Sequence, residues 1–108
     1  MTIDSNRLLP EFEKLRREIN FSVLNSALPE LNLSNLQPII TLVAESRRDY
    51  LKALVEMAEQ NTGNKPTSEQ IGELKAKRET FDELVSAANA LETAIQRDYL
   101  KVRTSRQG

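Results

Sequence analysis

Catalytic chemistry in this chain would have to come from a restricted set of side chains, because its 108 residues include no histidine and no cysteine. Nucleophilic catalysis of the usual kind pairs serine or cysteine with a histidine base, and that arrangement cannot be assembled here. Serine–lysine and carboxylate mechanisms stay open in principle. The three glycines, Gly63, Gly72 and Gly108, stand too far apart for a glycine-rich phosphate loop. The sequence therefore predicts a protein that is not an enzyme and uses no cofactor.

Acidic side chains are concentrated at Glu79, Asp82 and Glu83. Helical bundles can hold metal ions with inward-facing glutamates, but their usual ligand sets also contain histidine. Lys75 and Arg78 lie within one helical turn of the acidic residues and can neutralise them by ion pairing. We therefore interpret the cluster as a solvated charged face and predict no metal site.

Basic side chains gather toward the C-terminal end, at Arg97, Lys101, Arg103 and Arg106. Basic residues near a helix C-terminus suit the helix dipole, and no aromatic residue alternates with these charges as a stacking platform for nucleic acid. Fifteen basic and sixteen acidic residues give a net charge of −1, so no global field attracts nucleic acid or an anionic membrane. Nucleic acid is not the expected partner, although a nucleic-acid accessory protein using this basic end is an alternative.

The N-terminal residues lack the basic and apolar regions of a signal peptide. No apolar run approaches the roughly 20 residues needed to cross a bilayer. Without cysteine there is no disulfide framework to indicate an oxidising compartment. We therefore expect no membrane association, and the cytoplasm is the default location.

The longest predicted element is a helix over residues 68–104. Thr67 and Gln70 have the spacing of a capping box, in which each residue satisfies a backbone N–H of the other. No proline interrupts the sequence from this cap to Thr104. Apolar residues recur at heptad spacing, as in an amphipathic helix: Leu74, Phe81, Ala88, Ile95 and Val102.

A first helix is predicted over residues 10–27. Pro10 suits the first turn of a helix, and Pro29 disfavours helical geometry at Leu28. Three- and four-residue steps separate the apolar residues Phe12, Leu15, Ile19 and Val23.

A second helix is predicted over residues 35–61, capped by either Ser34 or Asn35. If Ser34 is the cap, Pro38 is the fourth helical residue, and if Asn35 is the cap, Pro38 is the third. Residues 61–66 contain Gly63 and Pro66, which are typical of a loop that ends one helix before the next begins.

Three helices joined by short connections predict one all-α domain over residues 1–108. We expect a three-helix antiparallel, up-down-up bundle with a long C-terminal helix. Its core is expected where two apolar stripes meet, the first contributed by Phe81, Leu84 and Leu91 and the second by Val43, Tyr50 and Leu54.

In this arrangement the third helix would outrun its neighbours by about three turns. Its projecting apolar end would be covered by linker leucines or by a second subunit. The expected partner-binding residues are Ile95, Tyr99, Val102, Leu31 and Leu33. We therefore expect a non-catalytic protein–protein interaction or self-association module, with a dimer favoured. The alternative in the same class is a small secretion or assembly chaperone that binds a partner's amphipathic helix.

Overall fold

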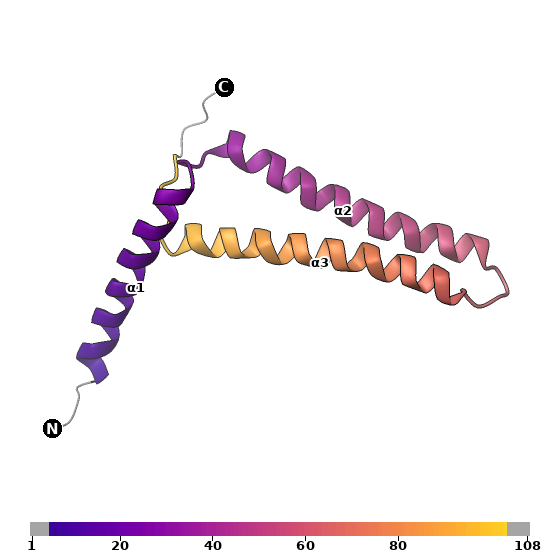
Figure 1. Ribbon diagram of the computed structural model, residues 1–108, viewed down its shortest axis with the longest axis horizontal. Coiled ribbons are helices and arrows are strands. Elements are labelled where there is room, and N and C mark those ends of the chain that lie inside the picture. Colours follow the sequence, from indigo (N-terminus) through magenta and orange to yellow (C-terminus); the bar gives the residue numbers. More distant parts are fainter. Residues whose placement is uncertain (1–4, 104–108) are drawn as a thin grey trace. The chain divides into compact units, whose positions relative to one another are not determined.

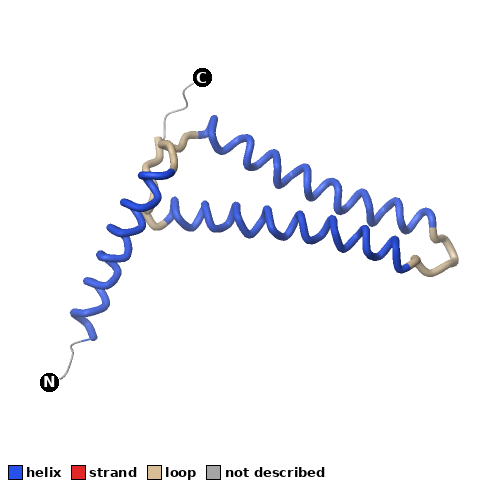
Figure 2. The backbone as a smooth tube through the Cα atoms, viewed as in Figure 1, coloured by secondary structure: helices blue, strands red, loops and turns tan. Residues whose placement is uncertain are grey.

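The computed structural model describes residues 5–103, and these residues form three helices joined by loops. They are α1 (Ser5–Ala27), α2 (Leu33–Gln60) and α3 (Ser68–Gln96), as Figures 1 and 2 show. The expected all-α class is confirmed. The chain divides into two compact units, one containing α1 with the residues from Leu91 onward and the other containing Leu36–Ala90. The expectation of a single domain stays a prediction.

The unit Leu36–Ala90 is an antiparallel pair of helices, in which α2 and α3 lie side by side (Figure 1). The connecting turn contains Gly63 at a φ of 81°, a left-handed conformation that glycine adopts without steric cost. Three- and four-residue steps separate the shielded positions of α2, which gives one continuous contact face: Leu36, Ile39, Val43, Ser46, Tyr50, Ala53 and Met57.

The centre of this helix pair is aromatic. The rings of Tyr50 and Phe81 lie 6.1 Å apart, and the Arg47 guanidinium lies 5.3 Å from the centre of the Phe81 ring. The expected meeting of Phe81 with Tyr50 is confirmed. The expectation for Leu54 was wrong, because this side chain is 46% exposed. Ala53 is the shielded residue instead. Leu54 follows it directly and is therefore rotated by about 100° around the helix axis, off the contact face.

Ser46 is a polar residue on this apolar contact face, and it is buried. Its hydroxyl donates a 2.8 Å hydrogen bond to the carbonyl oxygen of Val43 on the same helix. This bond removes the cost of burying an unpaired polar group.

The cap at the start of α3 has the predicted geometry. The Gln70 N–H donates to the Thr67 hydroxyl at 3.1 Å, and the Thr67 N–H donates to the Gln70 side-chain oxygen at 2.9 Å. Each residue therefore satisfies one backbone donor that the helix leaves without a carbonyl partner.

Replacing Thr67 by alanine is expected to lower the free energy of unfolding by about 1 kcal/mol, because the first turn loses its hydroxyl acceptor. Thr67→Asp is expected to cost little, since aspartate also caps and its charge suits the helix dipole. Urea melting of both variants checks this prediction. Equal losses would show that the Thr67 hydroxyl does not act as the cap.

The start of α2 differs from both expected alternatives. Asn32 and Asn35 exchange hydrogen bonds, the Asn35 N–H to the Asn32 side chain at 3.1 Å and the Asn32 N–H to the Asn35 side chain at 3.0 Å. Asn32 is therefore the cap, and α2 begins at Leu33. The first helix also begins earlier than expected, at Ser5, so Pro10 lies inside α1 and not in its first turn.

The expected extension of the third helix to Thr104 was wrong, because α3 ends at Gln96. Asp98 has a φ of 60°, its N–H donates to the Ile95 carbonyl at 3.1 Å, and the Tyr99 N–H donates to the Ala94 carbonyl at 2.9 Å. This pair of bonds is a Schellman ending, which usually places glycine at the left-handed position but tolerates a short polar residue. With 28 residues in α2 and 29 in α3, the expected three-turn overhang is absent.

Candidate interaction site

Residues after α3 pair with the linker that follows α1, inside the unit that contains both. The Leu31 N–H donates to the Lys101 carbonyl at 3.2 Å, and the Arg103 N–H donates to the Leu31 carbonyl at 2.7 Å. The Arg103 guanidinium also pairs with Glu30 at 2.7 Å. Leu31 and Leu100 are the two buried apolar residues of the described chain, at 6% and 5% exposure. This linker therefore packs against the chain's own C-terminal segment.

Asn25 fixes α1 to the same C-terminal segment. Its side-chain amide donates to the Tyr99 carbonyl at 2.9 Å, and its side-chain oxygen accepts from the Lys101 N–H at 2.9 Å. One side chain thus satisfies a donor and an acceptor of an irregular segment, which would otherwise lack backbone partners there. The Asn25 side chain projects from one side of α1, so these two hydrogen bonds determine which side of the helix faces the C-terminal segment.

The side of α1 that faces the C-terminal segment is mainly polar, with Phe21 as an apolar residue one turn before Asn25. Pro10, Lys14 and Arg17 share this side with Asn25, since residues four, seven, eight and eleven apart lie near one face of a helix. The opposite face is apolar. We call it the α1 stripe: Leu8, Phe12, Leu15, Ile19 and Val23.

The α1 stripe is exposed along its whole length. Its five side chains are 48–60% exposed, at 48% for Leu8, 52% for Phe12, 55% for Leu15, 53% for Ile19 and 60% for Val23. A helix of a folded domain normally buries such a face against a neighbour, and each fully buried side chain of this kind contributes about 1.5–3 kcal/mol. The stripe is therefore the main candidate for an interaction surface.

The five residues expected to bind a partner occupy different environments. Ile95 and Tyr99 are half-buried, Val102 is 40% exposed and Leu33 is 48% exposed. Leu31 is buried against the chain's own C-terminal segment, whereas Leu28, at 39% exposure, and Leu33 are not, so the expected cover by linker leucines is met by Leu31 alone. That these five residues bind a partner stays a prediction.

Sequence reasoning did not identify Asn25 or the separation of the two faces of α1. No local signal distinguished Asn25, because it lies in the last turn of α1, where a polar residue with low helix propensity disrupts little. The residue that it would bind, 74 positions later, could not be read from the sequence.

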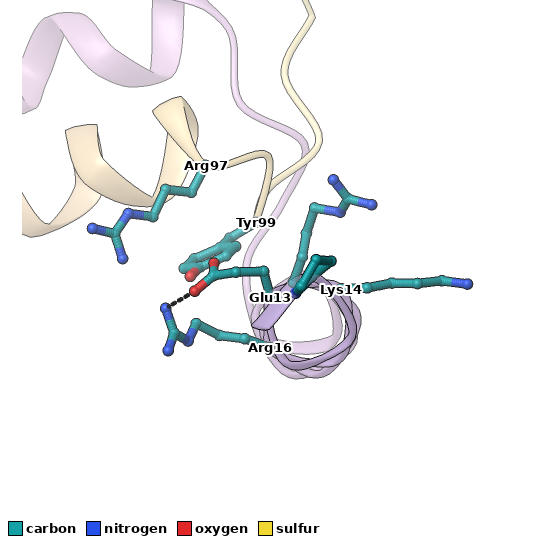
Figure 3. Close-up of a pocket in the computed structure, with 7 residues that line it drawn as sticks. Glu13, Lys14, Arg16, Arg97 and Tyr99 are labelled. Carbon is teal, nitrogen blue, oxygen red and sulfur yellow. Dashed lines mark hydrogen bonds and ion pairs between the residues drawn. The ribbon is translucent and has the colours of Figure 1, made fainter. Parts of the chain in front are cut away.

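A basic hollow of about 470 Å³ lies between the polar face of α1 and the end of α3, within one unit (Figure 3). Its walls are Pro10, Glu13, Lys14, Arg16, Arg17, Arg97 and Tyr99. Glu13 is its one acidic side chain, and the Glu13 carboxylate accepts a 2.7 Å charged hydrogen bond from Arg16. The structure therefore brings the basic residues of the first helix next to Arg97.

The part of the chain that the structure describes holds no group of three or more acidic, histidine or cysteine side chains suited to a metal ion. None of its helices is long and apolar enough to cross a membrane. Comparison of the chain with known families, curated proteins and solved structures gives no match to any of them. Functional inference therefore depends on the residues themselves.

Proposed function

We propose that the chain is a non-catalytic, cytoplasmic self-association module whose α1 stripe packs against the α1 stripe of a second copy. The observation that carries this proposal is the exposure of all five stripe residues on the face of α1 opposite to Asn25. Because α1 contacts the C-terminal segment through its polar face, its apolar face is free for another helix. A second copy supplies a face of the same length and spacing.

The stripe has the pattern of a short two-stranded coiled coil. Leu8, Phe12, Leu15 and Ile19 follow steps of four, three and four residues, the alternation of d and a heptad positions. Leucines occupy the first two d positions and Ser22 the third, and Phe12 and Ile19 occupy the a positions. Leucine at d with a β-branched residue at a favours two parallel strands. We therefore infer a parallel pairing of the two α1 helices.

The flanking charges favour the same orientation. Glu11 and Glu18 lie along one edge of the stripe at g positions, and Arg16 lies along the other at an e position. In a parallel pair, Glu11 of one helix faces Arg16 of the other, and the same contact occurs twice. In an antiparallel pair the two glutamate edges would face each other and repel. Charge complementarity thus supports a second copy of this chain as the partner.

A single cysteine at Leu8 tests this pairing, because the natural chain has no cysteine to compete. In a parallel pair the two d positions face each other, so Leu8→Cys is expected to form an interchain disulfide rapidly under mild oxidation. Nonreducing electrophoresis measures the cross-linked fraction over time.

Lys14→Cys is the matched control, since Lys14 is exposed on the opposite face of the same helix. It is expected to cross-link only at the slow rate of random collisions. Equal rates for the two variants would contradict pairing through the stripe. Cross-linking of Leu8→Cys only when mixed with Ile19→Cys would indicate antiparallel helices.

A further inference from the structure

Residues 97–103 interrupt a helical pattern that continues beyond the end of α3. Tyr99 and Val102 keep the apolar spacing that Ile95 carries within the helix, and this segment contains no glycine or proline. Asp98 is the one residue other than glycine with a positive φ in the described part of the chain. The left-handed conformation is less favourable for such a residue than helical geometry. The local sequence therefore favours helix where the structure has a turn and an extended segment.

Backbone groups of this segment have exchanged helical partners for tertiary ones. In a continued α3 the Arg103 N–H would donate to the Tyr99 carbonyl, which lies four residues earlier. In the structure the Arg103 N–H donates to the Leu31 carbonyl at 2.7 Å. The Asn25 side chain takes the place of helical partners, donating to the Tyr99 carbonyl and accepting from the Lys101 N–H, each at 2.9 Å. The Arg103 N–H can make one of its two bonds at a time, so the docked and helical arrangements exclude each other.

The docked arrangement depends on contacts with α1 and its linker. Burial of Leu31 and Leu100 favours it, because a helix would rotate Leu100 by about 100° from Tyr99 and away from the apolar face. Release leaves the Asn25 amide with a partner, since it also donates to the Phe21 carbonyl on α1 at 2.6 Å. A few long-range contacts therefore hold the segment against its local preference for helix.

We propose that residues 97–103 are a two-state element, which either docks on the linker after α1 or continues α3 as a helix. The structure shows the docked state. In the helical state Tyr99 and Val102 lie on the same helix face as Ile95, and Leu31 loses its cover. A molecule that binds Leu31 in its uncovered form thus extends α3, because binding to one state shifts the equilibrium toward it. Since Asn25 lies on the face of α1 opposite to the stripe, the element does not depend on self-association.

NMR measurement of backbone Cα chemical shifts on the full chain tests the proposal. Asn25→Ala removes both side-chain bonds to the segment and is expected to move the shifts of residues 97–103 toward helical values. Asp98→Ala is expected to move them in the same direction, because alanine favours helix and disfavours the left-handed conformation. This second variant leaves every side chain of α1 in place. Asp98→Gly is expected to keep the segment docked, since glycine adopts the left-handed conformation without steric cost.

Asn20→Ala is the matched control, because Asn20 also lies on α1 and its amide donates to the Arg16 carbonyl of the same helix at 2.9 Å. It is expected to leave the shifts of residues 97–103 unchanged. Random-coil shifts in both Asn25→Ala and Asp98→Ala would overturn the proposal, because the released segment would then have no second ordered state. Unchanged shifts in both variants would overturn it as well. An equal change in Asn20→Ala would do the same, since it would show a general loosening of α1.

Discussion

Phe81→Ala is expected to lower the free energy of unfolding by about 2–3 kcal/mol. A fully buried phenylalanine replaced by alanine costs about 3–5 kcal/mol, and Phe81 is half-buried. The substitution removes the ring contact with Tyr50 and the cation–π contact with Arg47 at the centre of the α2 and α3 pair. Urea denaturation followed by circular dichroism measures the loss.

Leu51→Ala is the control for this experiment, because Leu51 lies on α2 with 51% of its surface exposed. It is expected to cost less than about 1 kcal/mol. If the two substitutions destabilised the chain equally, Phe81 would not be part of the contact between α2 and α3.

Ile19→Lys is expected to dissociate the proposed dimer while the helical content stays close to that of the natural chain. Ile19 is 53% exposed in one chain, so a lysine there can reach water without disturbing the fold. In the pair of α1 helices the same position is an a position, and two lysines would face each other inside the apolar contact. Gel filtration and circular dichroism, measured on the same sample, separate loss of assembly from loss of structure.

Leu51→Lys is matched to this variant in exposure, at 51%, and in the charge that it introduces. It is expected to leave the assembly intact, because Leu51 lies outside the α1 stripe. Dissociation by both variants would show that association is not specific to α1.

Local patterns predicted the helices well where capping chemistry was explicit. Thr67 and Gln70 gave the start of α3 to the residue, and the expected end of α1 at residue 27 is also confirmed. The apolar spacing identified Phe81 and Tyr50 as partners, because facing helices must bring their apolar faces together.

The end of α3 could not be predicted from apolar spacing, because Tyr99 and Val102 continue the helical period after the helix has ended. The chain turns at Asp98, a residue that can adopt the left-handed conformation but does not require it. The pairing of Leu31 with Val102 joins residues 71 positions apart, and no local preference encodes such a contact. The hollow depends on the same pairing, since it places Arg97 beside the basic residues of α1.

Sedimentation equilibrium of the natural chain, over a wide micromolar range of concentration, tests self-association most directly. The mass is expected to approach twice the 12.3 kDa of one chain as concentration rises. Ile19→Lys is expected to remain at the mass of one chain with its helices intact. A mass of one chain at every concentration, together with unfolding of Ile19→Lys, would contradict self-association and would make the α1 stripe part of the chain's own core.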